Sequence, residues 1–287
     1  MEYVQFINGG ADDYVLGICG DGKVSMKHCT IDGSPDKGID MWWDEGDKFY
    51  AFENNIIRNC GTYPIVINDC RVINQLGSGN GYLENGKNFI QVTSSYFSEE
   101  TVTINNQGIP YLFKNSLTVG GAGKLIVAAG TSLYFNANES MYVDGYGYLQ
   151  VNGTADNPVT IRGLEDEAGY WKGIEFHSDR TNQGGSYLRH CTVSGAGSED
   201  WSADLYLAGG AKIALDHVTF DKSDLYGLSI YVPSQWDDNA EDYVQRWDLL
   251  GITANDVAFS NCRNGNVYDR NSEQVYDGSL IPTAKKK

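Results

Sequence analysis

Several features are scarce in this chain of 287 residues, and each scarcity excludes a class of protein. No apolar run reaches the roughly 20 residues that a membrane-spanning helix needs. Basic residues number only 21 against 38 acidic ones, so the formal net charge is −17, and no basic stripe is present. Because phosphate backbones repel such a surface, we expect no nucleic-acid partner. Cations, neutral or basic glycans and protein partners remain open.

The cysteines also lack a useful pattern. There are six, they are scattered, and no two have the Cys-x-x-Cys spacing of a structural zinc site. Several occupy apolar positions of a strand pattern, as Cys29 does in MKHCTI. We therefore expect buried free thiols that pack as small hydrophobic side chains, with a disulfide such as Cys60–Cys70 as the alternative. We predict no metal site here.

The first residues lack the features of a secretory leader. The segment MEYVQFINGG has neither a basic start nor an apolar core. It reads instead like the middle of a repeat, so we expect the chain to be a piece of a longer exported protein. The three lysines at 285–287 are expected to form a disordered tail.

What the chain does contain is a repeat of apolar residues in the stretch 124–176. Two residues spaced by two lie on the same face of a strand, and the residues between such pairs are Gly, Asn, Thr, Asp and Ser, which favour turns. The pairs are Leu125/Val127, Leu133/Phe135, Met141/Val143, Leu149/Val151, Val159/Ile161 and Ile174/Phe176.

Strands this short cannot bury their own apolar face, so they must coil until successive turns of the chain stack. The first four pairs start eight residues apart, and three such steps make a turn, or rung, of about 24 residues. The 34 glycines and 19 tyrosines also favour a β protein. The predicted fold is therefore an all-β parallel β-helix solenoid.

A second repeat relates distant parts of the chain. Residues 20–43 match residues 209–232 without a gap at an offset of 189, and residues 53–60 match residues 255–262 at an offset of 202. We call 20–60 the first copy and 209–262 the second copy. His28 and His217 fall on equivalent positions, where the apolar pattern slips by one residue, so we expect both at a corner that they stabilise by hydrogen bonds.

The two offsets differ by 13 residues, so the second copy carries an insertion in or near 233–250. We expect two units of one continuous solenoid, with rungs of a truncated first unit in 1–98 and of a fuller second unit in 99–287. The segment 74–100 is the expected seam between them, and the pattern fades beyond Asp269.

Three stretches of the second unit resemble a known family. GTADNPVTIRG at 153–163 is followed by YWKGIEF at 170–176 and YLRHCTVSGAG at 187–197. This order is similar to secreted bacterial proteins with a right-handed parallel β-helix of the pectin-lyase-like kind. The resemblance implies a right-handed solenoid, an extracellular or cell-surface location, and a core that receives Ile174 and Phe176 while Trp171 covers the wall. Many such proteins have no assigned activity, and others are polysaccharide lyases or glycoside hydrolases.

The resemblance gives little support for catalysis. A polygalacturonase-like hydrolase would require Asn-Thr-Asp, Asp-Asp, Gly-His-Gly and Arg-x-Lys motifs on neighbouring rungs. Only Asp-Asp occurs, at Asp12/Asp13 and Asp237/Asp238. A pectate-lyase-like mechanism would need calcium-binding carboxylates and a basic residue. Asp179, Arg180 and His177 are candidates for that role, but no further ligands are placed around them.

The insertion is the best candidate for a functional site. Aromatic rings beside carboxylates can stack on sugar faces and accept hydroxyl hydrogen bonds, and carboxylates can also hold Ca²⁺. The alternative is a solvated loop whose tryptophans pack on the solenoid wall. The candidate ligand-binding residues are Trp236, Asp237, Asp238, Glu241, Asp242 and Trp247.

Two hypotheses follow from these observations. The first is a non-catalytic exported surface module for adhesion, glycan binding or structural spacing, without a cofactor other than an optional Ca²⁺. The second is a polysaccharide lyase or glycoside hydrolase with a groove beside 233–250. The missing catalytic motifs favour the first.

Overall fold

The structure is a computed structural model that describes residues 1–11, 13–42, 47–177, 185–200 and 202–283. Strands hold 50% of the residues and helices 3%. The prediction of an all-β chain is therefore confirmed. Within the described ranges, no helix has the length and hydrophobicity that crossing a lipid bilayer requires.

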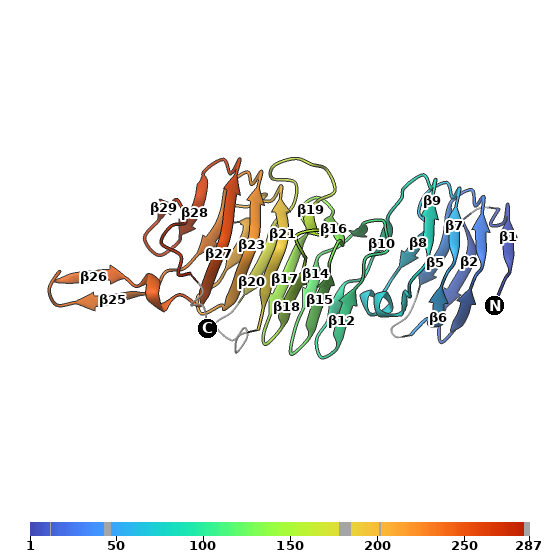
Figure 1. Cartoon of the computed structure of the whole chain (residues 1–287), viewed down its shortest axis with the longest axis horizontal. Helices are drawn as coiled ribbons and strands as arrows, with labels where there is room; N and C mark the ends of the chain where they lie inside the picture. Colours follow the sequence, from blue (N-terminus) through green and yellow to red (C-terminus); the bar gives the residue numbers. More distant parts are fainter. Residues whose placement is uncertain (12, 43–46, 178–184, 201, 284–287) are drawn as a thin grey trace.

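The strands are short and follow one another along an elongated molecule (Figure 1). In chain order they are β1 (Gln5–Ile7), β2 (Tyr14–Cys19), β3 (Val24–Lys27), β4 (Thr30–Asp32), β5 (Lys37–Trp42), β6 (Phe49–Glu53), β7 (Ile56–Arg58), β8 (Ile65–Ile67), β9 (Gly81–Leu83), β10 (Ile90–Val92), β11 (Tyr96–Phe97), β12 (Thr101–Ile104), β13 (Tyr111–Phe113), β14 (Leu117–Val119), β15 (Lys124–Ala128), β16 (Ser132–Phe135), β17 (Ser140–Asp144), β18 (Tyr148–Asn152), β19 (Val159–Gly163), β20 (Gly173–His177), β21 (Tyr187–Ser194), β22 (Ala203–Leu207), β23 (Ile213–Asp221), β24 (Tyr226–Ile230), β25 (Ser234–Asp237), β26 (Asp242–Gln245), β27 (Ile252–Ser260), β28 (Gly265–Asp269) and β29 (Gln274–Tyr276). Two 3-10 helices, η1 (Cys70–Gln75) and η2 (Trp247–Leu249), complete the described part.

Most strands pair in parallel with the strand one repeat further along the chain. A thirteen-stranded sheet runs in the order β12-β15-β18-β21-β19-β16-β13-β10-β8-β5-β2, with β23 and β27 added beyond β21. An eight-stranded sheet follows the order β11-β14-β17-β20-β22-β24-β28-β29, and a four-stranded sheet the order β1-β4-β7-β9. Leu125 pairs with Leu149 in parallel, at the predicted separation of about 24 residues. This pairing is compatible with a β-helix.

The apolar pairs of the repeat face the core. All twelve side chains of the six predicted pairs have a relative exposure of 0%, whereas the residues between them reach the outer surface. The period of two thus separates core from surface in every short strand. Turn residues such as Gly130, with a φ of 72°, reverse the chain between strands where a side chain would be strained.

We expected Trp171 to cover the wall, but it is fully buried in the core. Its ring stacks on Phe135 at a centroid distance of 4.8 Å, and Phe135 stacks on Phe113 at 5.1 Å. The indole Nε1 donates a hydrogen bond to the carbonyl oxygen of Ser194 at 2.8 Å. Because that bond satisfies its one polar group, the ring can be buried completely.

His28 and His217 lie at corners, as the slip in the pattern predicts. Both have left-handed backbone, with φ of 50° and 55°. His28 stacks on Tyr3 at 5.0 Å and His217 on His190 at 4.4 Å. His217 also bonds Asp216 through Nδ1 at 2.8 Å. The corners are therefore columns of stacked rings, and in the second copy a hydrogen bond supports the stack.

The insertion appears directly in the strand register. Thr30 in β4 pairs with Ile56, which follows 26 residues later, whereas its counterpart Thr219 in β23 pairs with Ala258, 39 residues later. The 13 extra residues therefore leave the stack between two successive strands without shifting their pairing.

All six cysteines are free, and Cys60 and Cys70 are not joined. Four of them are buried (Cys29, Cys60, Cys70 and Cys191), Cys262 is half-buried and Cys19 is exposed. Burial raises the pKa of the Cys70 and Cys191 thiols to about 12. These thiols therefore stay protonated and act as core side chains.

Candidate functional site

The insertion folds into a hairpin that projects from the end of the sheets (Figure 1). Its strands β25 and β26 pair antiparallel, from Ser234 opposite Gln245 to Asp237 opposite Asp242. Asp237 closes the turn, because its Oδ1 accepts hydrogen bonds from the backbone N–H groups of Asn239 at 2.8 Å and Ala240 at 3.3 Å. These bonds lower the pKa of Asp237 below its ordinary value. Its carboxylate is therefore engaged in forming the turn.

Two aromatic rings are exposed on this hairpin. Trp236 is 51% exposed and Tyr243, on the opposite strand, is 67% exposed. Their rings meet edge to face, with centroids 5.5 Å apart and an interplanar angle of 77°. The indole Nε1 of Trp236 donates to Asp238 Oδ1 at 2.9 Å, which fixes the indole. An edge-to-face pair leaves one ring face open to a ligand.

Trp247 belongs to the root of the insertion. It begins η2 and packs edge to face against Tyr276 at 4.9 Å, in contact with the hydrophobic core. Trp236 and Trp247 thus contact different partners: Tyr243 at the hairpin and Tyr276 at the sheet end. Of the predicted residues, the hairpin brings Trp236 and Asp238 together, while Trp247 fixes the root.

The remaining predicted carboxylates do not form a cluster. Asp242 accepts a hydrogen bond from the N–H of Tyr243 at 2.7 Å, and Glu241 is exposed in the turn with a φ of 51°. Across the described ranges, no group of three or more His, Cys, Asp and Glu side chains is arranged to hold a metal ion. The described carboxylates therefore offer no preformed calcium cage.

An open hollow lies between the hairpin and the end of the eight-stranded sheet. Its volume is about 520 Å³, and no charged side chain lines it. Amides, hydroxyls and two tyrosine rings face it: Ser234, Tyr243, Val244, Gln245, Asn271, Ser272, Gln274 and Tyr276. Residues 271–276 were missed in the sequence because they follow Asp269, where the repeat fades. The alternation Gln274-Val275-Tyr276 is the signal that was available.

A buried carboxylate holds the floor of this hollow. Asp269 has a relative exposure of 0%, and its oxygens accept bonds from Val232 N at 2.9 Å, Gln245 Nε2 at 2.6 Å and Ser272 Oγ at 2.6 Å. Tyr276 OH donates to Gln245 Oε1 at 2.9 Å. Each charge-assisted bond is stronger than a neutral one, so the hairpin root and the sheet end form one rigid unit.

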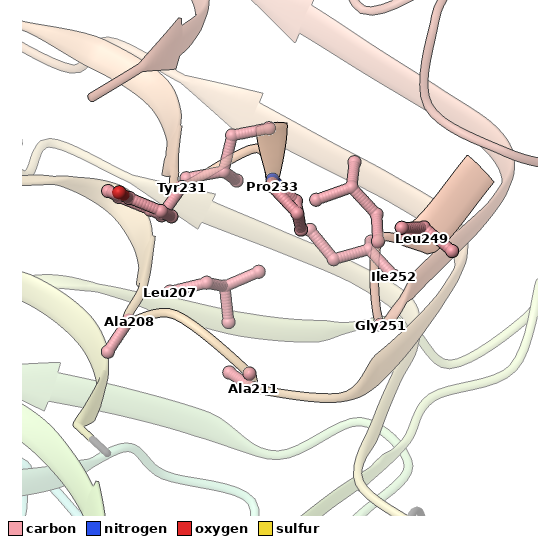
Figure 2. A pocket seen from close by; sticks show the side chains of 11 residues that line it. Leu207, Ala208, Ala211, Tyr231, Pro233, Leu249, Gly251 and Ile252 are labelled. Carbon is pink, nitrogen blue, oxygen red and sulfur yellow. The ribbon is translucent and has the colours of Figure 1, made fainter. Parts of the chain in front are cut away.

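A second, apolar pocket lies at the root of the insertion. Figure 2 shows its lining, which includes Leu207, Ala211, Tyr231, Leu249 and Ile252. Its volume is about 60 Å³, enough for only a few water-sized groups. The pocket is therefore a gap where the insertion joins the core, and it is too small for a sugar ring.

The outer face of the eight-stranded sheet carries a stack that the sequence reading missed. His177 lies between Tyr142 at 4.4 Å and Tyr206 at 5.1 Å, and its Nε2 is 2.6 Å from Glu175 Oε2. The guanidinium of Arg270 covers the Tyr206 ring at 4.9 Å. His177 and Tyr206 therefore have both ring faces covered and offer no free face to a sugar.

The weaker catalytic candidates gain no support from their surroundings. Asp179 and Arg180 lie outside the described residues, as does Asp12. Asp13 pairs with Lys37, its Oδ1 2.5 Å from Nζ. His177 is engaged with Glu175.

Comparisons of the chain with protein-family models, curated proteins and solved structures found no match. The resemblance to pectin-lyase-like proteins therefore stays a prediction from the three sequence stretches.

Proposed function

We propose that this chain is a non-catalytic module of an exported surface protein, and that it binds a neutral glycan at the hollow beside the insertion hairpin. The proposal includes the finer description of the fold as a right-handed parallel β-helix with an internal duplication. The parallel pairing of strands about one repeat apart supports that description.

One observation carries the binding proposal: the lining of the 520 Å³ hollow combines an exposed aromatic ring with amides and hydroxyls and has no charged side chain. Sugars present apolar C–H faces and a rim of hydroxyls. Tyr243 offers a ring for the face, and Gln274 and Ser234 offer hydrogen-bonding groups for the rim. In the parts of the chain that the structure describes, the side chains of these three residues make no hydrogen bond, although the backbone N–H of Tyr243 donates to Asp242.

The same lining favours binding over catalysis. Glycoside hydrolysis uses two carboxyl groups that flank the bond to be broken. Here no carboxylate lines the hollow, and Asp269 beneath its floor is fully buried with its oxygens already bonded to Val232, Gln245 and Ser272. A carboxylate held in this way positions neighbours and is poorly placed to transfer a proton to a sugar oxygen.

A glycan array followed by titration calorimetry with the neutral oligosaccharides that bind tests this proposal. Tyr243→Ala is expected to weaken binding at least about tenfold, because it removes the stacking ring. Trp236→Ala is expected to weaken it less, since Trp236 buttresses Tyr243 from the side. Tyr50→Ala is the matched control, because Tyr50 is 76% exposed on β6, outside the hollow.

Two results would contradict the proposal. One is the absence of binding across neutral, basic and acidic glycans, which would leave only the spacing role. The other is release of reducing or unsaturated ends from a polysaccharide panel, with or without Ca²⁺, which would establish a hydrolase or a lyase.

A further inference from the structure

Strand β27 has one paired edge and one largely free edge. Its inner edge pairs with β23 along its length (Figure 1). On the outer edge, the described part of the chain makes only an isolated bridge between Ala254 and Thr283, where Ala254 N donates to Pro282 O at 2.9 Å. A hollow of about 380 Å³ lies between this edge and residues 277–283.

The first copy shows what covers the equivalent edge. Residues 53–60, which match 255–262, are covered by β9, where Ile56 pairs with Gly81 and Arg58 with Leu83. Asn54 N donates to Ser78 O at 3.0 Å, Gly81 N donates to Asn55 O at 2.7 Å, and Asn59 N donates to Leu83 O at 3.2 Å. The segment thus adds to the edge as a parallel strand.

Two asparagine side chains complete this cover. The backbone N–H of Asn55 donates to Asn80 Oδ1 at 3.0 Å, and the N–H of Cys60 donates to Asn85 Oδ1 at 3.0 Å. Between them, Tyr82 is only 4% exposed and lies in register with Ile57, which is fully buried. The covering segment therefore combines a strand, two amide acceptors five residues apart and one aromatic anchor.

The second copy presents the same groups without that cover. Equivalent backbone groups face the preceding strand in the two copies, because Lys222 N donates to Ser260 O at 3.0 Å just as Gly33 N donates to Arg58 O at 3.1 Å. The groups that should face outward are then the N–H and C=O of Val257 and of Phe259 and the N–H groups of Asp256, Asn261 and Cys262. Within the described ranges, no hydrogen bond outside the strand ladders engages any of them.

The apolar side chains at this edge are only partly covered, by residues 277–283. Phe259 corresponds to the fully buried Ile57 but is partly exposed, as is Val257. A row of unpaired backbone groups beside half-exposed apolar side chains is the template for addition of a strand. A glycan would neither match the spacing of the backbone donors along a strand nor cover the apolar side chains at this edge.

We propose that the free edge of β27 is a docking site for an extended segment of a partner protein, which adds to it as a parallel strand. The first copy defines the chemistry of that segment: Asn at its first and sixth positions and an aromatic or large apolar residue at the third. This site is separate from the glycan hollow, so either proposal stands or fails alone.

The test uses the peptide SGNGYLENGK, which copies residues 78–87, with the whole chain as receptor. Binding is measured by fluorescence anisotropy of the labelled peptide, and amide hydrogen exchange locates it. We expect slower exchange at Asp256, Val257, Asn261 and Cys262. Replacing either asparagine of the peptide by alanine should weaken binding about fivefold, the value of one neutral hydrogen bond.

Val257→Lys should abolish binding, because it places a charge at the half-exposed apolar edge. Val4→Lys is the matched control, since Val4 is also partly buried against the core but lies at the other end of the molecule. Circular dichroism shows whether both variants fold. If Val257→Lys does not fold, the peptide variants and the exchange data still decide.

Three outcomes would overturn the proposal: no peptide binding, binding without protection of those four amides, or equal affinity for the peptide that lacks both asparagines. Sedimentation of the chain alone tests a different occupant. If the chain self-associates as its concentration rises, and if Val257→Lys and Val4→Lys both abolish this association, the end that carries Val4 of a second copy occupies the edge. The proposal of a separate partner protein would then be wrong.

Discussion

The first and second copies build the same corner from different surroundings. In each, an asparagine with left-handed backbone donates to an aspartate on the preceding rung: Asn59 to Asp32 at 2.7 Å and Asn261 to Asp221 at 2.8 Å. In each, a Cβ atom added to the matched glycine, Gly38 or Gly227, would come within about 3 Å of the sulfur of the matched cysteine, Cys60 or Cys262. These matched contacts indicate that the corner tolerates few substitutions.

The copies differ most at one buried position. β2 and β22 hold equivalent places, because Tyr14 pairs with Lys37 and Ala203 pairs with Tyr226. Asp204 therefore stands where the first copy has Val15. It has a relative exposure of 0%, its Oδ1 accepts from Ala196 N at 3.1 Å, and its Oδ2 has no partner in the described part of the chain. Desolvation raises the pKa of Asp204 well above its ordinary value.

The largest expected effect comes from adding a methyl group to the matched glycines. In Gly38→Ala the new Cβ would lie 2.6 Å from both the Pro64 carbonyl oxygen and Ile57, and these cannot move aside. We expect a loss of about 3 kcal/mol of unfolding free energy. In Gly227→Ala the nearest atom, at 2.5 Å, belongs to the half-exposed ring of Phe259, which can turn away.

Gly227→Ala should therefore cost clearly less than Gly38→Ala, as measured by denaturant unfolding. Gly81→Ala is the control, because its Cβ would meet only Ile56, at 4.0 Å. Equal losses at Gly38 and Gly227 would show that the second corner is as rigid as the first.

The next effect concerns pH. Asp204 binds its proton more tightly in the folded chain than in the unfolded chain, so its contribution to stability is complete below its ordinary pKa and is lost as pH rises toward the raised pKa. The slope is at most about 1.4 kcal/mol per pH unit. Asp221 and the Cys262 thiol are the titratable groups coupled to it.

Asp204→Asn should remove this slope, and Val15→Asp should introduce one of the same sign in the first copy. Urea unfolding at four values between pH 5 and pH 8 measures both, each against the unmodified chain. A wild-type slope that persists in Asp204→Asn would assign the pH dependence to another group.

A smaller effect is expected at the matched asparagines. Asn59→Ala and Asn261→Ala place alanine in left-handed backbone, which it tolerates less well, so each should cost about 1 kcal/mol. The hydrogen bond from Asn59 is the leading reason that the pKa of Asp32 lies below its ordinary value, ahead of Arg58.

Asn59→Ala should therefore raise the pKa of Asp32. A carboxyl group whose pKa is lowered by folding stabilises the folded chain at pH values above its ordinary pKa, and this stability is lost as pH falls through its pKa in the folded chain. The variant loses part of this contribution, so its stability should be less sensitive to acid. Carboxyl NMR titration measures the shift. An unchanged pKa in the variant would mean that Arg58 sets it.

The smallest effect on stability is expected at the hairpin tip. Trp236→Ala should change the unfolding free energy by no more than about 0.5 kcal/mol, because the ring is 51% exposed and packs on Tyr243 of the same hairpin. Trp247→Ala should cost more, since that ring packs on Tyr276 and the core. Thermal unfolding compares them, and equal losses would show that the hairpin tip also packs on the body.

Much of the fold was visible in the sequence. The period of two in Leu125/Val127 and its partners predicted which side chains are buried, because strand geometry alone sets that alternation. The two offsets predicted the insertion and its length, since parallel pairing must absorb extra residues outside the stack. Trp171 was misjudged because the carbonyl of Ser194, which satisfies its indole, comes from another rung.

The site was predictable only in part. Trp236 and the carboxylates of the hairpin were found because the insertion breaks the duplication. Asn271, Gln274 and Tyr276 were missed, since their contacts with the hairpin are long-range: Asp269 lies 24 residues and Tyr276 31 residues from Gln245 in the chain. A hydrogen-bonded floor of this kind leaves no periodic signal.

The sequence by itself determined the repeat, the duplicated corners and the place of the insertion, because these follow from local spacing and from the backbone preferences of glycine, asparagine and the short apolar pairs. Only the tertiary structure decided which rings stay exposed, that Asp204 is buried where Val15 has its place, and that the described residues leave most of the outer edge of β27 unpaired. Those outcomes depend on which segment packs over each strand, and this is set by the stacking of segments that lie far apart in the sequence.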